Sequence, residues 1–364
     1  MFVRRKELVS ALKVILGVAK GGLMPICECC KVEFSRDGIV LSATDLETSV
    51  KICVPSTISK NEKGSIVLNA KLLAAIVGDK ADDEVEIHLK GGKVFIGRAK
   101  INASEDSDNF PEIPSPPKHG ASIYELEASF PNAVKFVIPA MSKEASRYAL
   151  CGVLLDFRRG RVVASDGMRL HTAAIGKPAN ITPVILNPKI FKVIAPEKVV
   201  VPEPEKISGS NEKRIARVYL AFPNGIAVVR TIDGKFPEYA NLIPKKSPSR
   251  FETVRMEFLK CLKKVQRFVS ADYDTCKITA DGSLIISAKS VEKGVEITEE
   301  VPGKLNGKKQ TIGINPRFVS DSLAGMKSER VNIYLRNKNS PMLMESVSDK
   351  GSYYALIMPL SDNE

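Results

Sequence analysis

One four-residue pattern recurs three times along this 364-residue chain and constrains its fold more than any other feature. In each copy an asparagine is followed by alanine or proline, then a basic residue, then a large apolar residue, and a short apolar run precedes it. The copies are Asn69-Ala70-Lys71-Leu72, Asn187-Pro188-Lys189-Ile190 and Asn315-Pro316-Arg317-Phe318. Asparagine caps helix N-termini well and proline suits the first helical turn, so each copy predicts a strand followed by a helix.

A second set of helices is predicted upstream of these three, from apolar residues at helical spacing. Residues at i, i+4, i+7 and i+11 lie on one face of an α-helix. Three segments show this spacing: Leu8, Leu12, Ile15 and Ala19; Phe130, Val134, Val137 and Met141; and Phe258, Leu262, Val265 and Val269. We therefore expect three equivalent helices, each with its apolar face toward a core.

Lysine occupies the same solvent-side position in all three of these helices. Position i+5 lies away from the apolar stripe, and it is Lys13, Lys135 and Lys263 in the three copies. Further basic residues extend the exposed faces: Lys20, Lys143, Lys260, Lys264 and Arg267. Two interpretations remain open: ordinary solvated helix faces, or a common basic surface that faces one shared polyanionic ligand.

The other residues of each repeat are typical of antiparallel strands. An early hairpin is predicted in every copy, around residues 32–41, 154–163 and 278–286, and later hairpins turn at residues 90–93, 223–225 and 337–341. Segments 114–120 and 245–250 separate the copies. The sequence thus predicts an α+β protein of three repeated domains, 1–120, 121–247 and 248–364, each with two helices packed on antiparallel sheets.

Composition narrows the functional classes. With 54 Lys plus Arg against 42 Asp plus Glu, the formal net charge is +12, which favours nucleic acid as a partner. No apolar run is long enough for a membrane span, so no membrane partner is expected. Cys27, Cys29 and Cys30 lack the paired spacing and the histidines of a zinc site, so we expect buried thiols and no metal or other cofactor. Seven cysteines without secretory context indicate a reducing cytoplasm.

The motifs of common enzyme classes are incomplete. Ser165-Asp166 with His171 suggests a hydrolase, but the G-x-S-x-G nucleophile elbow is missing. Residues 90–93 lack the length and the terminal Lys-Ser/Thr of a phosphate-binding loop. We therefore expect a protein that is not an enzyme.

Several motifs together resemble the bacterial sliding clamp family, the beta subunit of DNA polymerase III. They occur in the family's order over essentially the whole chain: Ala43 to Glu47, Phe110 to Pro114, Ser146 to Leu150, Ala164 to Leu170, Asp233 to Tyr239 and Met358 to Leu360. The resemblance implies three clamp domains per chain and a head-to-tail homodimer that closes into a ring of six domains, with helices lining the hole. Such a ring encircles duplex DNA and tethers the replicative polymerase as a non-catalytic processivity subunit, in the bacterial cytoplasm at the nucleoid.

The resemblance and the basic helix faces together predict the residues that face DNA. Mobile charges around the hole would attract phosphates without reading bases, which permits sliding. The predicted residues are Lys13, Lys20, Lys71, Lys135, Lys143, Arg147, Tyr148, Lys189, Lys260, Lys263, Lys264, Arg267 and Arg317.

The resemblance also implies a hydrophobic pocket between the second and third domains. It would capture short linear peptides of the polymerase, the clamp loader and repair proteins. The matching residues are Leu150, Ser165, Gly167, Met168, Arg169, Leu170, Pro237, Leu242, Asn315, Phe318, Met342, Leu356, Met358, Pro359 and Leu360. Flexible methionines would adapt to different peptides, and backbone groups with Arg169 would fix the peptide's orientation.

The family's subunit interface joins the first domain of one chain to the third domain of the other. Ile101 and Ala103 match its apolar positions on one side, and Phe268 and Val269 match them on the other. Two alternative functions remain open. One is a clamp paralogue specialised for repair or for a mobile element. The other, from a different class, is a sequence-specific DNA-binding regulator, which would need a helix that reads base edges.

Overall fold

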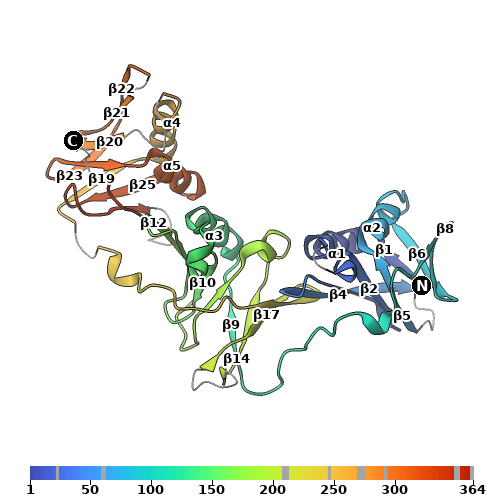
Figure 1. Cartoon of the computed structure of the whole chain (residues 1–364). Helices are drawn as coiled ribbons and strands as arrows, with labels where there is room; N and C mark the ends of the chain where they lie inside the picture. The colour runs from blue at the N-terminus through green and yellow to red at the C-terminus, as the bar shows by residue number, and fades with distance from the viewer. Residues whose placement is uncertain are drawn as a thin grey trace. The chain divides into compact units, whose positions relative to one another are not determined.

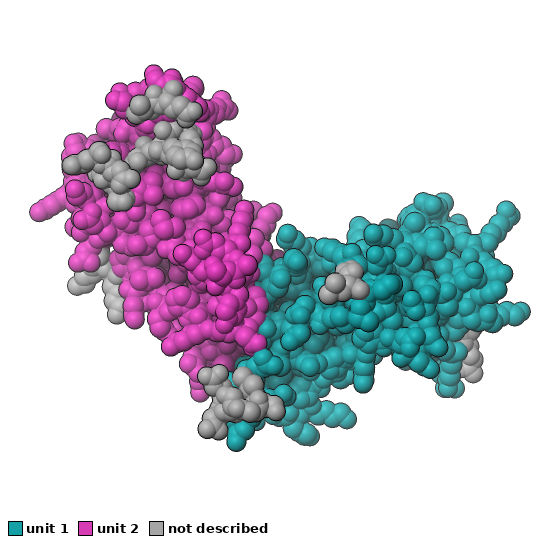
Figure 2. Space-filling model, viewed as in Figure 1, with its two compact units in different colours: residues 1–128, 186–231 teal, residues 129–185, 232–364 magenta. Residues whose placement is uncertain are grey.

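The structure, a computed structural model, describes residues 1–21, 24–58, 63–206, 213–244, 247–268, 276–290, 293–347 and 353–360. The chain divides into two compact units (Figure 2). Unit 1 comprises residues 1–128 and 186–231, and unit 2 comprises residues 129–185 and 232–364. The expected middle domain contributes residues to both units, so the division into three domains stays a prediction. Within the described ranges, no helix is long and apolar enough to cross a membrane.

The main sheet of unit 1 has twelve strands among the described residues, and several of them are labelled in Figure 1. The main path of antiparallel neighbours is β8-β7-β6-β1-β4-β18-β17-β14-β9, and β3, β2 and β5 branch from β4. The strands are β1 (Phe2–Arg4), β2 (Cys29–Phe34), β3 (Gly38–Thr44), β4 (Thr48–Ile58), β5 (Gly64–Asn69), β6 (Glu84–Lys90), β7 (Lys93–Ile96), β8 (Ala99–Asn102), β9 (Ala121–Glu125), β14 (Lys198–Pro202), β17 (Arg217–Phe222) and β18 (Gly225–Arg230). A separate ribbon pairs β15 (Glu205–Lys206) with β16 (Lys213–Arg214).

The helices of unit 1 pack on this sheet and on one another. They are α1 (Arg5–Val18), α2 (Ala70–Gly78) and the 3-10 helices η1 (Pro25–Glu28), η2 (Ser107–Asn109) and η5 (Pro188–Lys192). α1 contacts β3, β4, α2 and η5. A Cβ at Gly17 would lie 2.4 Å from a methyl carbon of Val193, so glycine at this position lets the chain after η5 approach α1 closely.

The described residues of unit 2 form two sheets and three α-helices. The nine-stranded sheet has the order β13-β10-β11-β12-β27-β26-β25-β19-β23, and the four-stranded sheet has the order β22-β21-β20-β24. The strands are β10 (Val153–Asp156), β11 (Arg161–Ser165), β12 (Arg169–Ala174), β13 (Val184–Leu186), β19 (Ser249–Val254), β20 (Cys276–Asp281), β21 (Ser283–Ser290), β22 (Val295–Val301), β23 (Gly303–Gly307), β24 (Gln310–Ile314), β25 (Arg330–Leu335), β26 (Met342–Ser346) and β27 (Tyr353–Ile357). The helices are α3 (Phe130–Val137), α4 (Arg255–Val265), α5 (Pro316–Gly325), η3 (Ile138–Ala140), η4 (Ala145–Leu150) and η6 (Ala240–Leu242).

The predicted apolar stripes are confirmed in α1, α3 and α4. Their described members inside the helices are all at most 2% exposed: Leu8, Leu12, Ile15, Phe130, Val134, Val137, Phe258, Leu262 and Val265. Ala19 and Met141 lie past the ends of α1 and α3, and Val269 lies outside the described residues. The three early hairpins are also confirmed, with registers such as Leu154↔Val163.

The three asparagine caps are confirmed, but one of the three helices is shorter than predicted. The side-chain oxygen of Asn69 accepts from the Leu72 amide at 3.0 Å, and those of Asn187 and Asn315 accept from Lys189 and Arg317 at 3.1 and 3.0 Å. After Asn187 only the five-residue 3-10 helix η5 forms. The sequence continues with β-branched Val193-Ile194 and then Pro196, and the residue before a proline disfavours the α conformation.

Candidate functional site

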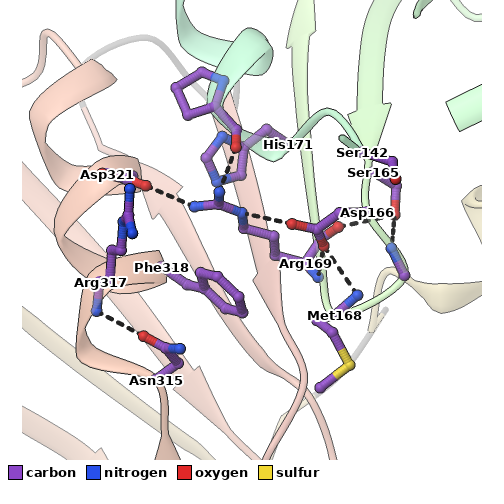
Figure 3. Close-up of polar contacts among 12 residues, drawn as sticks. Ser142, Ser165, Asp166, Met168, Arg169, His171, Asn315, Arg317, Phe318 and Asp321 are labelled. Carbon is purple, nitrogen blue, oxygen red and sulfur yellow. Dashed lines mark hydrogen bonds and ion pairs between the residues drawn. The ribbon is translucent and has the colours of Figure 1, made fainter. Parts of the chain in front are cut away.

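A tight turn between β11 and β12 positions the first group of predicted residues (Figure 3). One carboxylate oxygen of Asp166 accepts from the backbone amides of Met168 at 3.0 Å and Arg169 at 2.9 Å. The Ser165 hydroxyl donates to the Arg169 carbonyl at 2.8 Å, and Gly167 adopts a φ of +90°, which favours glycine. The turn thus holds the Met168 side chain at the surface, where it is 45% exposed.

Arg169 connects three elements of unit 2. Its guanidinium donates to Asp166 at 3.0 Å, to Asp321 of α5 at 2.8 Å and to the carbonyl of Pro139 in η3. It also lies over the Phe318 ring, 4.3 Å from the ring centroid. The side chain is only 10% exposed. These partners bind the guanidinium nitrogens, and the Phe318 ring lies against the guanidinium plane. Arg169 therefore holds α5 against the turn and sets the position of Phe318.

The strand period of two divides the predicted pocket residues between the faces of the nine-stranded sheet. Arg169 pairs with Ile357, and Ile357 pairs with Met342, so these three form one row on one face. His171, two residues further along β12, stacks on Phe136 of α3, so this is the face that the helices cover. Leu170 points to the opposite face and pairs with Leu356.

The opposite face carries a buried apolar cluster that supports the second group of predicted residues. Leu170 and Leu356 belong to this cluster and are 3% and 2% exposed. Leu150 packs against it from η4, and Ile243 packs against it just after η6. Leu242 beside Ile243 is 51% exposed, and Pro237 is also exposed. This face therefore presents exposed apolar side chains above a well-packed apolar layer.

The segment after β27 lies next to the first group of predicted residues and next to the end of β24. The amide of Met358 donates to the Met168 carbonyl at 2.9 Å, and the amide of Leu360 donates to the Gly313 carbonyl at 2.9 Å. Met358 is 37% exposed, whereas Pro359 and Leu360 are half-buried. Two exposed methionines, Met168 and Met358, thus lie on neighbouring, hydrogen-bonded segments at the ends of β12 and β27.

The predicted pocket residues all belong to unit 2, and most lie around the ends of β12 and β27. Met342, Leu170 and Leu356 are buried, so they form the support of this surface rather than its exposed part. Asn315 caps α5, and Phe318 of the same helix is half-buried under Arg169. The side chains able to touch a ligand directly are the exposed ones, chiefly Met168, Leu242 and Met358.

His171 and Ser165 do not form a catalytic pair. His171 is fully buried, with Nδ1 2.9 Å from the Phe136 carbonyl and Nε2 2.8 Å from the Ser322 hydroxyl. Burial lowers its pKa to about 4. Ser165 instead donates to the backbone of its own turn. The hydrolase-like pattern in the sequence therefore does not correspond to a nucleophile and base in contact.

The residues predicted to face DNA are all exposed. Lys13, Lys20, Lys71 and Lys189 lie in unit 1, and the others lie in unit 2. Within the described part of the chain, Lys264 pairs with Glu299 and Arg147 pairs with Glu144, each at 2.9 Å. Such exposed pairs are weak and exchange easily with solvent, so both cations remain able to meet a phosphate.

The residues predicted for the subunit interface are partly accessible. Ile101 in β8 is 3% exposed and packs inside unit 1, whereas Ala103 beyond the strand is exposed. Phe268 is 42% exposed, and Val269 lies outside the described residues. β8 ends the path of the unit 1 sheet, and β22 ends the four-stranded sheet of unit 2, so each has an unpaired edge among the described strands.

The cysteine cluster is buried. Cys27, Cys29 and Cys30 are at most 4% exposed, and burial raises the pKa of Cys30 to about 12. Cys27 lies in the 3-10 helix η1, and Cys29 and Cys30 begin strand β2. Over the described ranges, no group of three or more His, Cys, Asp or Glu side chains is placed to hold a metal ion.

Sequence reasoning missed the two carboxylates that organise the site. Asp166 builds the turn and pairs with Arg169, and Asp321 pairs with the same guanidinium from 152 residues away. The Asp-Gly dipeptide at 166–167 is a turn signal that could have indicated the first role. No local pattern indicates the second role, because it depends on how α5 packs.

The chain matches known proteins over nearly its whole length. The family model for the DNA polymerase III beta subunit, N-terminal domain, matches residues 1–114, and the model for the C-terminal domain of the same subunit matches residues 240–361. The beta sliding clamp of Bacillus subtilis is 23% identical, and that of Pseudomonas putida is 25% identical, each comparison covering 98% of both chains.

Solved structures share the fold. The DNA polymerase III subunit beta of Pseudomonas aeruginosa superposes with a TM-score of 0.83 at 22% identity, covering 99% of each chain. That of Thermotoga maritima gives a TM-score of 0.82 at 23% identity, covering 99% of this chain and 98% of the other. These findings confirm the resemblance in the sequence motifs: the chain belongs to the family of the DNA polymerase III beta subunit, the DNA sliding clamps.

Proposed function

We propose that this chain pairs head-to-tail with a second copy to form a closed ring that encircles duplex DNA. The ring would hold the replicative polymerase on its template by topology, without catalysing a reaction itself, in the bacterial cytoplasm at the nucleoid. Family membership carries this proposal, because both terminal family models match in their expected order. The repeated basic helix faces add a physical reason for a DNA ligand.

The basic faces suit sliding rather than sequence recognition. Lys13 of α1, Lys135 of α3 and Lys263 of α4 occupy the same register of three equivalent helices, and all three are exposed. Flexible, hydrated ammonium groups attract phosphates without fixing a register on the duplex. A ring lined by such groups would follow the backbone of any sequence.

Salt dependence tests this role of the lysines. A variant with glutamine in place of Lys260, Lys263, Lys264 and Arg267 should bind DNA with a shallower dependence of log K on log salt, by about 0.9 for each phosphate that is no longer neutralised. A matched variant replaces four exposed lysines outside the predicted set: Lys277, Lys289, Lys304 and Lys327. If both variants change the slope equally, the assignment of the α4 face to DNA is wrong.

Dimer formation is supported by two of the sheet edges that are free among the described strands, those of β8 and β22. β8 and β22 expose unpaired backbone groups among the described strands, and pairing of such edges between chains would satisfy them. The mass in solution should therefore be twice the 39.7 kDa of the chain. A mass equal to one chain at micromolar concentration would contradict the ring.

Peptide capture is supported by the apolar surface around Met168, Leu242 and Met358. Adaptable methionines above a rigid apolar layer suit several peptides of related sequence. Met358→Ala combined with Leu360→Ala should abolish binding of polymerase-derived peptides and leave the dimer intact. Met256→Ala removes an exposed methionine of α4 outside the predicted pocket and serves as the control. Retained peptide binding in the double variant would locate the peptide site elsewhere.

A further inference from the structure

A basic cleft of about 300 Å³ opens on unit 2, outside every residue set predicted from the sequence. It is lined by Lys277, Lys309, Gln310, Thr311, Gly313 and Lys338. Three lysine residues from three separate segments therefore line one space. One of the three, Lys309, is paired with Asp281, and the ammonium nitrogen lies 2.6 Å from the carboxylate.

Strand alternation explains why Lys277 faces outward. In β20, Cys276, Ile278 and Ala280 are buried, so Lys277 and Thr279 point away from that core. Thr279 and Thr311 of the neighbouring strand β24 share a hydrogen bond of 3.0 Å on this outer face. Lys338, in the turn between β25 and β26, reaches the same cleft.

The cleft adjoins the surface proposed to bind peptides. Gly313 lines the cleft, is the direct partner of Lys277 in the β20–β24 pair, and accepts the hydrogen bond from the Leu360 amide at 2.9 Å. One backbone group therefore connects the lysines to the segment 358–360. A peptide lying on Met358 and continuing past Leu360 would carry its next residues over the cleft.

We propose that the cleft binds acidic side chains next to the apolar part of a peptide ligand. This inference rests on the proposed peptide-binding function and adds a second element of specificity to it: apolar residues for the methionine surface and carboxylates for Lys277, Lys309 and Lys338. Exposed lysines contribute modestly one by one, but three around one cleft attract several carboxylates together and speed encounter. The attraction should weaken in high salt.

Fluorescein-labelled peptides test the proposal on the full-length dimer. Two acidic peptides share an apolar half of leucine and phenylalanine; in one, four glutamates follow this half, and in the other they precede it. Each acidic peptide has a control twin in which glutamines replace the four glutamates. At about 50 mM salt, the better acidic peptide should bind about tenfold more tightly than its twin. The advantage should nearly vanish at about 1 M salt, where the Debye length is about 3 Å.

A pair of variants assigns the effect to the cleft. Lys277→Gln with Lys338→Gln should remove most of the acidic peptide's advantage and leave binding of the glutamine twin unchanged. Lys304→Gln with Lys327→Gln changes the net charge equally but alters no residue that lines the cleft, so the advantage should persist. The same loss in both variants would overturn the proposal.

The remaining outcomes separate this inference from the function on which it rests. If glutamate and glutamine peptides bind equally well, the cleft proposal fails while peptide capture stands. If neither peptide binds, peptide capture fails and the cleft proposal fails with it. If the Lys277 and Lys338 replacements weaken DNA retention but not acidic peptide binding, the cleft serves DNA and the proposal is wrong.

Discussion

The buried histidine of β12 makes the stability of unit 2 depend on pH. His171 lies between the carbonyl of Phe136 and the hydroxyl of Ser322, and its ring stacks on Phe136 at 4.8 Å. Burial is the main cause that lowers its pKa from 6.5 to about 4, and the Arg169 guanidinium lowers it further. The Phe136 carbonyl, Asp321 and Asp166 act in the opposite direction. The neutral ring is therefore the form that the fold accommodates.

The sign and size of the effect follow from this shift. Above pH 6.5 the ring is neutral in both states, so its pKa shift costs no stability. Below pH 6.5 the His171 ring is protonated in the unfolded chain, whereas in the folded chain it stays neutral down to about pH 4. The free energy of unfolding therefore falls as the pH falls through this window. Each pH unit below 6.5 costs about 1.4 kcal/mol of unfolding free energy. Because only the interval from pH 6.5 to pH 5 contributes, the loss between pH 7 and pH 5 is about 2 kcal/mol.

Urea unfolding followed by circular dichroism measures this loss. Wild-type protein should lose about 2 kcal/mol between pH 7 and pH 5 beyond the loss in His171→Gln, which has no titrating ring. His88→Gln removes a partly exposed histidine of unit 1 and should behave like wild type. If His171→Gln shows the same pH dependence as wild type, the buried ring is not the source and the reasoning is refuted.

Three further predictions concern contacts that shape the fold. Arg169→Met should lower the free energy of unfolding in urea by about 2–3 kcal/mol, because it leaves the carboxylates of Asp166 and Asp321 without their cation in a partly buried site. Arg147→Met removes an exposed ion pair and should lower it by less than about 1 kcal/mol. Equal losses would contradict the role given to Arg169. Asn315→Ala should cost about 1 kcal/mol through the lost cap of α5, measured as a lower melting temperature, and Asn315→Asp should restore it. Gly17→Ala should destabilise unit 1 by about 1–2 kcal/mol despite alanine's better helix propensity, because its methyl overlaps Val193; a gain in stability by urea unfolding would contradict this packing.

The features that could be predicted from sequence are local and repeated. The stripe at Leu8, Leu12 and Ile15 needs only the helical period, and the cap at Asn69 needs only the residue and its neighbours. Repetition in three copies strengthened each assignment. The same reasoning overestimated the helix after Asn187, because β-branched residues and Pro196 limit it to η5.

The candidate site was harder to predict because its contacts join distant segments. Arg169 stays a predicted peptide contact, and the contacts of its guanidinium with Asp166, Asp321 and the Phe318 ring could not be predicted from the sequence. No spacing rule connects residue 169 to residue 321. The basic cleft has the same origin, since Lys277, Lys309 and Lys338 converge only after β20, β24 and the turn following β25 are assembled.

Retention on circular DNA tests the central claim most directly. The protein is loaded onto a nicked circular duplex by its clamp loader, the complex is isolated at high salt, and the circle is then cut once. A ring linked by topology should stay on the intact circle and leave after linearisation, unless bulky blocks close both DNA ends. Protein that remains on unblocked linear DNA, or that leaves the uncut circle at the same rate, would contradict an encircling ring.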